Sequence, residues 1–428
     1  MVMYTSPMAS PNETPRQETQ KPGTRNQNNK SVRSRNIKRI LLLVKDLEPV
    51  SLDTLVQKSS LTYPTVLGII KQLEKDAHVE NIAYAPTTGG RQAVLYGICG
   101  IARYVLALHL DGETVDITIT NIRDGKIFHA TEQVPQAGAS HETPPAAQEP
   151  SPTTTVEQHS LAPRIAAVVQ DILRKTRLEL TSLVNICITY PEGTQLDMHA
   201  LATHLGEYLH APVEAVPDRT VLNYLERRSY HISSLHRYIF VLYDKELSLS
   251  VYRGPVETTD ALAGRTYFGH MTMDIAGAAC TCGNQGCLQS YMAGDGLLQA
   301  YRTAVEQHGL QYRPMVERDS DLFHAVLAES YKGDKAARTA IDHAIRMLAV
   351  ALANVIKIEG IATIVLSGVF TSTDIQYKRL LERYIAEYLP EDFPTAAVII
   401  LGTTSPGDCS YAACLMMNAQ YFNQLNFE

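Results

Sequence analysis

Three of the seven cysteines fall within the nineteen-residue stretch GHMTMDIAGAACTCGNQGC, which runs from Gly269 to Cys287. With His270, the thiols of Cys280, Cys282 and Cys287 provide four ligands for a soft metal ion. Three thiolates and one imidazole complete the tetrahedral shell of Zn²⁺, and the intervening glycines allow tight turns. The spacing favours a closed, structural zinc site. The alternatives are a Cys-x-Cys redox pair or reduced core thiols.

A second informative region lies near the N-terminus. Apolar residues recur at helical spacing over 37–47, Ser51 is placed to cap a second helix, and Thr62 is placed to cap a third. Two runs rich in strand-forming residues follow, and the Gly-Gly pair between them suits a hairpin turn. Three helices and a β-hairpin within residues 31–100 predict a winged helix-turn-helix domain.

Such a domain would place the N-terminal end of its third helix in the major groove of DNA and the hairpin tip near phosphates or the minor groove. Basic residues at the start of the first helix would contact phosphates. The predicted DNA contacts are Thr62, Tyr63 and Thr65 on the third helix, Arg91 on the hairpin, and Arg33 and Arg35 on the first helix. The alternative is a small helical domain that binds protein.

Charge divides the chain in the same way. Residues 1–100 carry 13 Lys+Arg against 8 Asp+Glu, a balance of +5, and the remaining residues carry 25 against 37, a balance of −12. The two regions therefore suit different partners.

The polar residues 1–30 have the composition of a disordered tail and lack the continuous apolar core of a secretory signal. The sequence contains no long uncharged apolar run of the kind that predicts a membrane span. We therefore expect a cytoplasmic protein that does not interact with membranes, whose thiols remain reduced.

Residues 101–428 form a predicted α/β body in which strands alternate with helices, a pattern that indicates largely parallel or mixed sheets with covered faces. The pattern predicts a first lobe of about residues 101–230 plus a C-terminal helix, and a second lobe of about 231–400. Residues 132–158 are rich in Pro, Ala and Thr, and we expect a flexible insertion there.

The arrangement G-H-x9-C-x-C-G-x2-G-C from Gly269 to Cys287 resembles the zinc signature of the ROK family of repressors, open reading frames and sugar kinases. A winged helix-turn-helix domain before an α/β body resembles the repressor branch of that family. The resemblance implies an actin-like (ribonuclease H-like) kinase fold for the body, and a homodimer or tetramer whose paired winged helices bind a palindromic operator.

Kinases of the family begin this body with a strand and an Asp-x-Gly-Gly-Thr turn that receives ATP phosphates. Alignment of LALHLDGETVDITI with that pattern places His109 at the Asp, Asp111 at the first Gly and Glu113 at the Thr. Acidic side chains in a phosphate-binding turn would repel the nucleotide. The segment YDKELSLSVYRGP also lacks the Gly-rich turn usual in the second lobe. We therefore expect no enzymatic activity.

The sugar pocket implied by the resemblance is altered as well. Asp218 retains the carboxylate of the family's catalytic Asp but follows Pro217 instead of Asn, and it is equally well placed to cap the next helix. Tyr267 and Gln289 stand where relatives have glutamates. The candidate effector contacts are Asp218, Tyr267, His270 and Gln289.

Together these features predict a DNA-binding repressor of carbohydrate-metabolism genes. Its kinase-like body would bind a sugar or sugar derivative and hold structural Zn²⁺. The alternatives are an ATP-dependent sugar kinase with an accessory N-terminal domain, or a scaffold that binds another protein through the zinc lobe.

Overall fold

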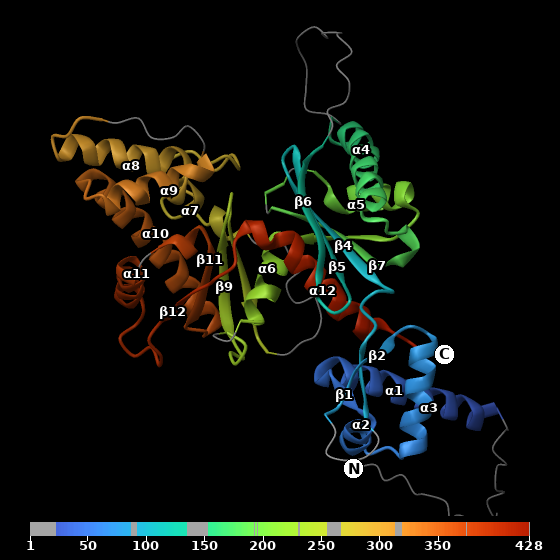
Figure 1. The fold of residues 1–428 in the computed structure, drawn as a ribbon. Helices are drawn as coiled ribbons and strands as arrows, with labels where there is room; N and C mark the ends of the chain where they lie inside the picture. The colour runs from blue at the N-terminus through green and yellow to red at the C-terminus, as the bar shows by residue number, and fades with distance from the viewer. Residues whose placement is uncertain are drawn as a thin grey trace, which may run out of the picture. The chain divides into compact units, whose positions relative to one another are not determined.

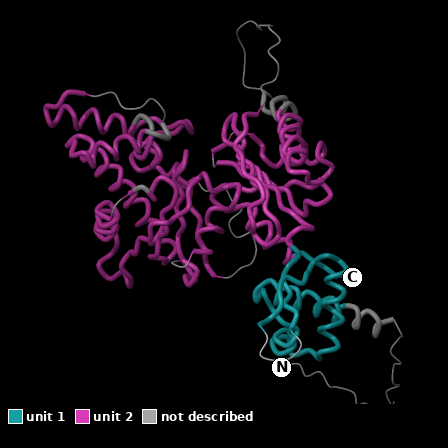
Figure 2. The backbone as a smooth tube through the Cα atoms, viewed as in Figure 1, with its two compact units in different colours: residues 1–99, 424–428 teal, residues 100–423 magenta. Residues whose placement is uncertain are grey.

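The computed structural model of the 428-residue chain describes residues 23–86, 92–134, 153–191, 193–194, 196–229, 232–254, 267–312, 319–373 and 375–427. The chain divides into two compact units (Figure 2). The N-terminal unit consists of Met1–Cys99 with Gln424–Glu428, and the body consists of Gly100–Asn423.

Three helices and a small sheet make up the N-terminal unit. Its elements are α1 (Gly23–Leu47), β1 (Val50–Ser51), α2 (Leu52–Ser59), α3 (Tyr63–Lys75), β2 (Val79–Tyr84) and β3 (Val94–Ile98). The buried faces of the helices include Ile40, Leu55 and Ile70, each at 0% exposure. These apolar stripes hold the helices together, since burial of a large aliphatic side chain contributes about 1.5–3 kcal/mol.

The helix starts follow local sequence. Ser51 is the N-cap of α2, and its hydroxyl accepts a hydrogen bond from the N–H of Thr54. Thr62 stands at the N-cap of α3, but its hydroxyl is 2.8 Å from that of Thr65 and makes no cap bond. Pro64 lies in the first turn of α3, where an absent N–H costs nothing.

The sheet of this unit has the order β1-β3-β2. Strands β2 and β3 form the expected antiparallel hairpin, and the two-residue strand β1, which sequence patterns did not predict, pairs with β3. Residues 424–427 complete the unit, where the ring of Phe427 meets the ring of His78 edge-on at 5.5 Å between centroids.

The first lobe of the body contains a five-stranded sheet of order β6-β5-β4-β7-β8. Its strands are β4 (Tyr104–Asp111), β5 (Thr114–Asn121), β6 (Lys126–Gln133), β7 (Leu183–Tyr190) and β8 (Val213–Pro217). Strands β4, β7 and β8 are parallel, and β5 and β6 are antiparallel additions. Helices α4 (Thr153–Thr176) and α5 (Met198–Leu209) pack on one face.

The second lobe contains a four-stranded sheet of order β10-β9-β11-β12. Its strands are β9 (Tyr238–Tyr243), β10 (Leu247–Tyr252), β11 (Thr363–Gly368) and β12 (Val398–Leu401). One face is covered by α7 (Leu288–Met292), α8 (Gly294–Gln307), α9 (Asp319–Tyr331), α10 (Lys335–Glu359) and α11 (Ile375–Tyr388).

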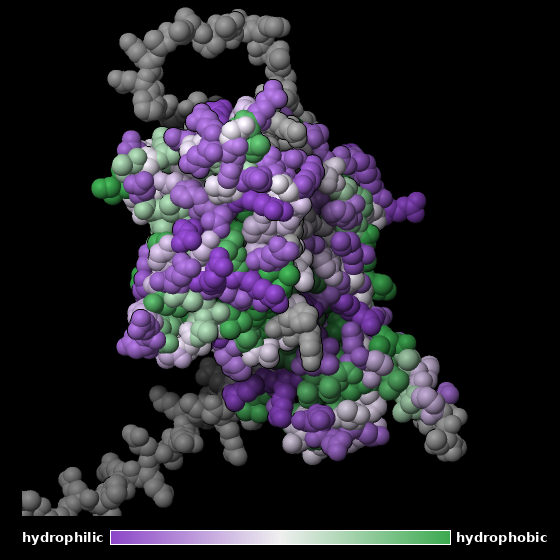
Figure 3. Space-filling model, turned by 90° about the vertical axis from the view of Figure 1, so that its left-hand side faces the viewer, coloured by the Kyte–Doolittle hydropathy of each residue, from purple (hydrophilic) through white to green (hydrophobic). Residues whose placement is uncertain are grey.

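Helix α10 is long and apolar enough, by length and composition alone, to cross a membrane. More than half of that apolar stretch is buried, and its alanines and leucines belong to the core of the second lobe. The surface on the side of α8–α11 is predominantly hydrophilic, with small apolar areas (Figure 3). We therefore read α10 as a core helix.

Two helices lie between the sheets of the body, α6 (Asp218–Arg227) and α12 (Cys409–Gln424) (Figure 1). Their core contains Val105 and Cys187 from the first sheet, Phe240 from the second, and Cys414 from α12. This central layer joins the two lobes. It brings the ends of β4, β7 and β9 to one region of the body.

Two element boundaries differ from the sequence-based expectations. Helix α1 begins at Gly23, inside the expected tail 1–30, and α4 begins at Thr153, inside the expected insertion 132–158. Adding a residue to an existing helix costs little once an amphipathic segment has nucleated it, so composition misjudges such ends. Residues 1–22 and 135–152 lie outside the described residues.

Candidate functional site

The structure brings His270, Cys280, Cys282 and Cys287 together. Their ligand atoms all lie within 4.8 Å of one another. Cys280 Sγ is 3.5 Å from His270 Nδ1, and Cys282 Sγ is 3.7 Å from Cys287 Sγ. Ligands bound tetrahedrally to Zn²⁺ are separated by about 3.5 Å for a sulfur–nitrogen pair and about 3.8 Å for a sulfur pair. The donor set and its spacing therefore fit this ion.

Backbone geometry holds this cluster in place. Cys280 N–H donates to the carbonyl of Asn284 at 2.8 Å, which closes the turn between the ligands. Gly283 and Gly286 have φ values of 89° and 64°, in the left-handed region. A Cβ on Gly286 would lie 1.6 Å from the carbonyl oxygen of Asp274, so only glycine fits there.

The environment of Cys280 suits a metal ligand. Burial would raise its pKa, but hydrogen bonds from Cys282 and His270 outweigh burial and lower it to about 7. The thiolate is therefore accessible near neutral pH, as metal binding requires.

The second ring nitrogen of His270 faces a carboxylate. His270 Nε2 is 3.9 Å from Glu246 Oε2, in the turn between β9 and β10. Histidine ligands of zinc are commonly oriented by a carboxylate on the other nitrogen. Sequence reasoning missed Glu246, because nothing in the local pattern connects that turn to the cysteine stretch.

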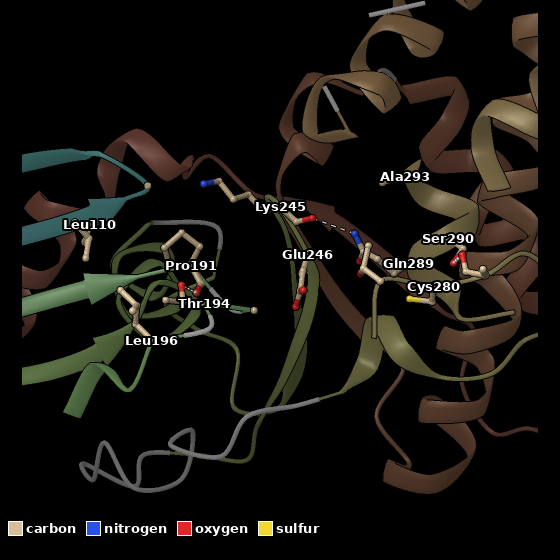
Figure 4. A pocket seen from close by; sticks show the side chains of 14 residues that line it. Leu110, Pro191, Thr194, Leu196, Lys245, Glu246, Cys280, Gln289, Ser290 and Ala293 are labelled. Atoms are coloured by element: carbon tan, nitrogen blue, oxygen red, sulfur yellow. Dashed lines mark hydrogen bonds between the residues drawn. The ribbon is translucent and has the colours of Figure 1, made fainter. Parts of the chain in front are cut away.

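The body contains a cavity of about 650 Å³ next to this cluster (Figure 4). Residues from both lobes line it, among them Gly112, Thr194, Lys245, Glu246, Cys280, Gln289 and Ser290. A Cβ on Gly193 would lie 2.3–2.5 Å from the carboxylate of Glu246. The Glu246 side chain therefore lies directly against the backbone of the loop after β7. The volume and the polar lining suit a small hydroxylated ligand.

One ion pair connects two turns at the edge of this cavity. Lys245 Nζ, in the β9–β10 turn, is bonded to Asp111 Oδ1 at the end of β4. Asp111 is thus paired, which corrects the expectation of an uncompensated negative charge in this turn. The positive charge of Lys245 offsets the negative charge of Asp111.

His109, at the position of the kinase Asp, is buried at 6% exposure, and its Nδ1 lies 2.9 Å from Thr189 Oγ1. Burial lowers its pKa, although Asp111 and Asp116 act in the opposite direction. His109 is consequently neutral at pH 7 and supplies no carboxylate for a metal–nucleotide complex.

Of the four predicted effector contacts, Gln289 is the one that lines the cavity, and the rings of Tyr267 and His270 lie 6.4 Å apart. Gln289 lines the cavity, but its amide accepts from the N–H of Leu247 at 2.8 Å and donates to the carbonyl of Lys245 at 3.0 Å, so it supports the β9–β10 turn. Tyr267 is 62% exposed, and His270 belongs to the metal cluster. None of Asp218, Tyr267 and His270 is among the residues that line the cavity.

Asp218 is buried in the first turn of α6. Its Oδ1 accepts a hydrogen bond from the N–H of Arg219 at 2.5 Å. This bond to the next residue is not an N-cap bond, since Pro217 is the N-cap of α6, so both roles considered for Asp218 stay predictions.

Five of the six predicted DNA contacts lie in the described residues. Thr62, Tyr63 and Thr65 are exposed at the N-terminal end of α3, and Tyr63 is 48% exposed. Arg33 and Arg35 are exposed on α1. Arg33 Nη2 donates to Gln72 Oε1 on α3 at 3.0 Å. Arg91 lies outside the described residues.

The two-lobed body and its Cys/His cluster define a mixed α/β protein of the sugar-kinase-like type. The model of the ROK family matches residues 146–412, more than half of the chain. The chain therefore belongs to the ROK family, as the zinc-like signature indicated.

Two similar proteins from Escherichia coli are regulators. They are the DNA-binding transcriptional dual regulator NagC of strain K12 and the N-acetylglucosamine repressor of strain O6:H1. Each is 24% identical over 356 residues, which cover 80% of this chain and 82% of the relative.

Solved structures with the same fold include both branches of the family. A ROK family transcriptional regulator, described as a homolog of the E. coli MLC protein, has a TM-score of 0.68 at 17% identity, covering 91% of this chain and 97% of its own. A ROK hexokinase from Thermus thermophilus has a TM-score of 0.52 at 17% identity, covering 73% and 97%. The fold alone thus does not separate regulators from kinases.

Proposed function

We propose that this protein is a DNA-binding transcriptional repressor whose kinase-like body has no catalytic role and responds to a sugar or sugar derivative. The observation that carries this proposal is the N-terminal unit, in which α3 presents Thr62, Tyr63 and Thr65 to solvent. A kinase has no need of such a unit, whereas regulators among the relatives match most of the chain.

The order α1-α2-α3-β2-β3 supports a winged helix-turn-helix domain in the N-terminal unit. In this proposal α3 is the recognition helix, and the β2–β3 hairpin is the wing that carries Arg91. Arg33 and Arg35 contact phosphates. By the family resemblance, a homodimer or tetramer presents paired units to a palindromic operator.

Two features of the body support the loss of kinase activity. The Asp111–Lys245 ion pair occupies the turn that receives phosphates in family kinases, and His109 replaces the acidic group expected nearby. Phosphoryl transfer depends on charge neutralisation by a bound metal and on backbone N–H groups that approach the phosphates. The missing carboxylate at His109 would weaken metal binding, and the ion pair would hinder that approach.

The fit of the Cys/His cluster supports a structural Zn²⁺ held by His270, Cys280, Cys282 and Cys287. With four protein ligands no position remains for a substrate, so the ion would fix the fold of its loop. Glu246 would orient His270 and at the same time face the cavity.

The cavity is the proposed effector site, with Glu246, Thr194 and Ser290 as its polar contacts. A carboxylate and hydroxyls are well suited to pairs of sugar hydroxyls. Because the cavity is lined from both lobes, an effector would shift their arrangement and so alter the spacing of the paired winged helices.

The test combines two assays on the full chain. Genomic footprinting identifies a duplex, and fluorescence anisotropy measures its affinity with and without a sugar panel. A coupled ATP assay is run over the same panel. We expect salt-dependent, sequence-selective DNA binding and no turnover. Turnover that disappears in Asp218→Asn, without DNA affinity, would reassign the protein as a kinase. A stoichiometric protein partner without DNA affinity would favour a scaffold.

A further inference from the structure

A shallow groove of about 390 Å³ runs between α1 and α3 in the N-terminal unit. Its rims carry side chains that hydrogen-bond, with Arg33 and Asn36 on α1 and Thr65 and Gln72 on α3. Arg33 Nη2 donates to Gln72 Oε1, which holds the two rims in a fixed relation. Gly68 lies on the floor of this groove.

A glycine at position 68 is unexpected. It lies in the middle of α3, where glycine disfavours the helix relative to alanine. Its φ is not in the left-handed region, and a Cβ built on it would meet no atom within 4 Å. Neither backbone conformation nor packing against the described residues requires glycine at this position, and α3 is left with open space above residue 68.

We propose that Gly68 is the point of closest approach between α3 and one strand of duplex DNA, and that the groove between α1 and α3 receives that strand. This inference rests on the proposed DNA-binding function. Arg33 supplies a positive charge for a phosphate, and Thr65 and Gln72 flank Gly68 on the same side of α3, within reach of base edges. A methyl group at residue 68 would hold the helix away and lengthen these contacts.

The substitution Gly68→Ala separates folding from binding. Alanine should raise the thermal unfolding midpoint of the N-terminal unit by about 4 °C, because it favours the helix. The same change should weaken binding by about tenfold to a duplex enriched by the wild-type chain from a random-sequence library, because contacts to base edges are lost. Gly68→Val should weaken it further. Binding to an unrelated duplex should change by less than about threefold.

The experiment uses the full chain in anisotropy titrations at physiological salt, with Gln57→Ala as a control. Gln57 is exposed on α2 and does not line the groove. Loss of affinity in Gly68→Ala with a folded, stabilised chain supports the proposal. Equal affinity of wild type and Gly68→Ala for the enriched duplex overturns this inference and leaves the DNA-binding function intact. If the wild-type chain enriches no duplex, both fall.

Discussion

At the scale of single residues, the cysteine stretch contains most of what the metal cluster needs. Ligand types and spacing follow from the sequence alone, and so do the glycines that permit the turn. The carboxylate that faces His270 does not, because Glu246 is brought there by the β9–β10 hairpin. The ligands of such a site can therefore be predicted from the sequence, whereas the groups that orient the ligands cannot.

The first prediction concerns Cys282→Ser. Removal of one thiolate from a four-ligand shell should lower zinc content from about one ion per chain to less than half, and should destabilise the second lobe. Metal analysis after dialysis and thermal unfolding measure both effects. Gln285→Ala, exposed in the same loop, serves as the control. Unchanged zinc in Cys282→Ser would show that the assignment of this ligand is mistaken.

The Asp111–Lys245 pair is a contact that alignment of the sequence with the kinase turn does not reveal. These residues are 134 positions apart, and only the meeting of the two hairpin turns makes them partners. Both side chains are nearly half exposed, so the pair contributes little to stability. The pair matters because it connects two turns at the edge of the cavity.

At the scale of elements, one buried carboxylate connects α6 to the segment that leads into α12. Glu226, at 1% exposure, accepts hydrogen bonds from the N–H groups of Thr403 and Thr404 and from the Thr403 hydroxyl. The Thr404 N–H would otherwise be buried without a partner. This contact fixes the chain after β12 and hence the start of the central helix.

The prediction at this scale is that Glu226→Ala destabilises the body by about 3 kcal/mol, because several charge-assisted hydrogen bonds are lost and the Thr404 N–H remains buried. Chemical denaturation measures the free energy of unfolding. Glu207→Ala, whose side chain is 69% exposed, should change it by less than about 0.5 kcal/mol. A similar effect of the two substitutions would refute a structural role for Glu226.

Sequence patterns predicted some helices and strands better than others. The helices of the N-terminal unit carry clear apolar stripes and capping residues, and strands such as β9 and β11 are continuous apolar runs. The pairing of β1 with β3 was not predictable, since a two-residue strand has no periodicity. The two lobes of the body were predicted from the alternation of strands and helices, whereas the actin-like fold came from family resemblance, because strand order depends on distant contacts.

At the scale of the whole molecule, the N-terminal unit is built from two distant segments. Residues 425–427 follow α12 directly and contribute Phe427, whose ring meets that of His78. The chain therefore passes between the unit and the body twice.

We expect Phe427→Ala to lower the stability of the N-terminal unit by about 1 kcal/mol, because an aromatic pair contributes about 0.5–1.5 kcal/mol beyond burial. The stability of the body should not change. Hydrogen exchange, resolved for each unit, separates these effects. Asn426→Ala, at an exposed neighbour, is the control. Equal exchange of helices α1–α3 in wild type and Phe427→Ala would contradict the role of this contact.

The split origin of the N-terminal unit also has a consequence during synthesis. When the ribosome has produced residues 23–99, the partner of His78 does not yet exist, and it emerges only after the whole of Gly100–Asn423 has been translated. The proposed DNA-binding unit is thus completed only after the body has been translated. A nascent chain that stalls in the body would carry this unit without Phe427.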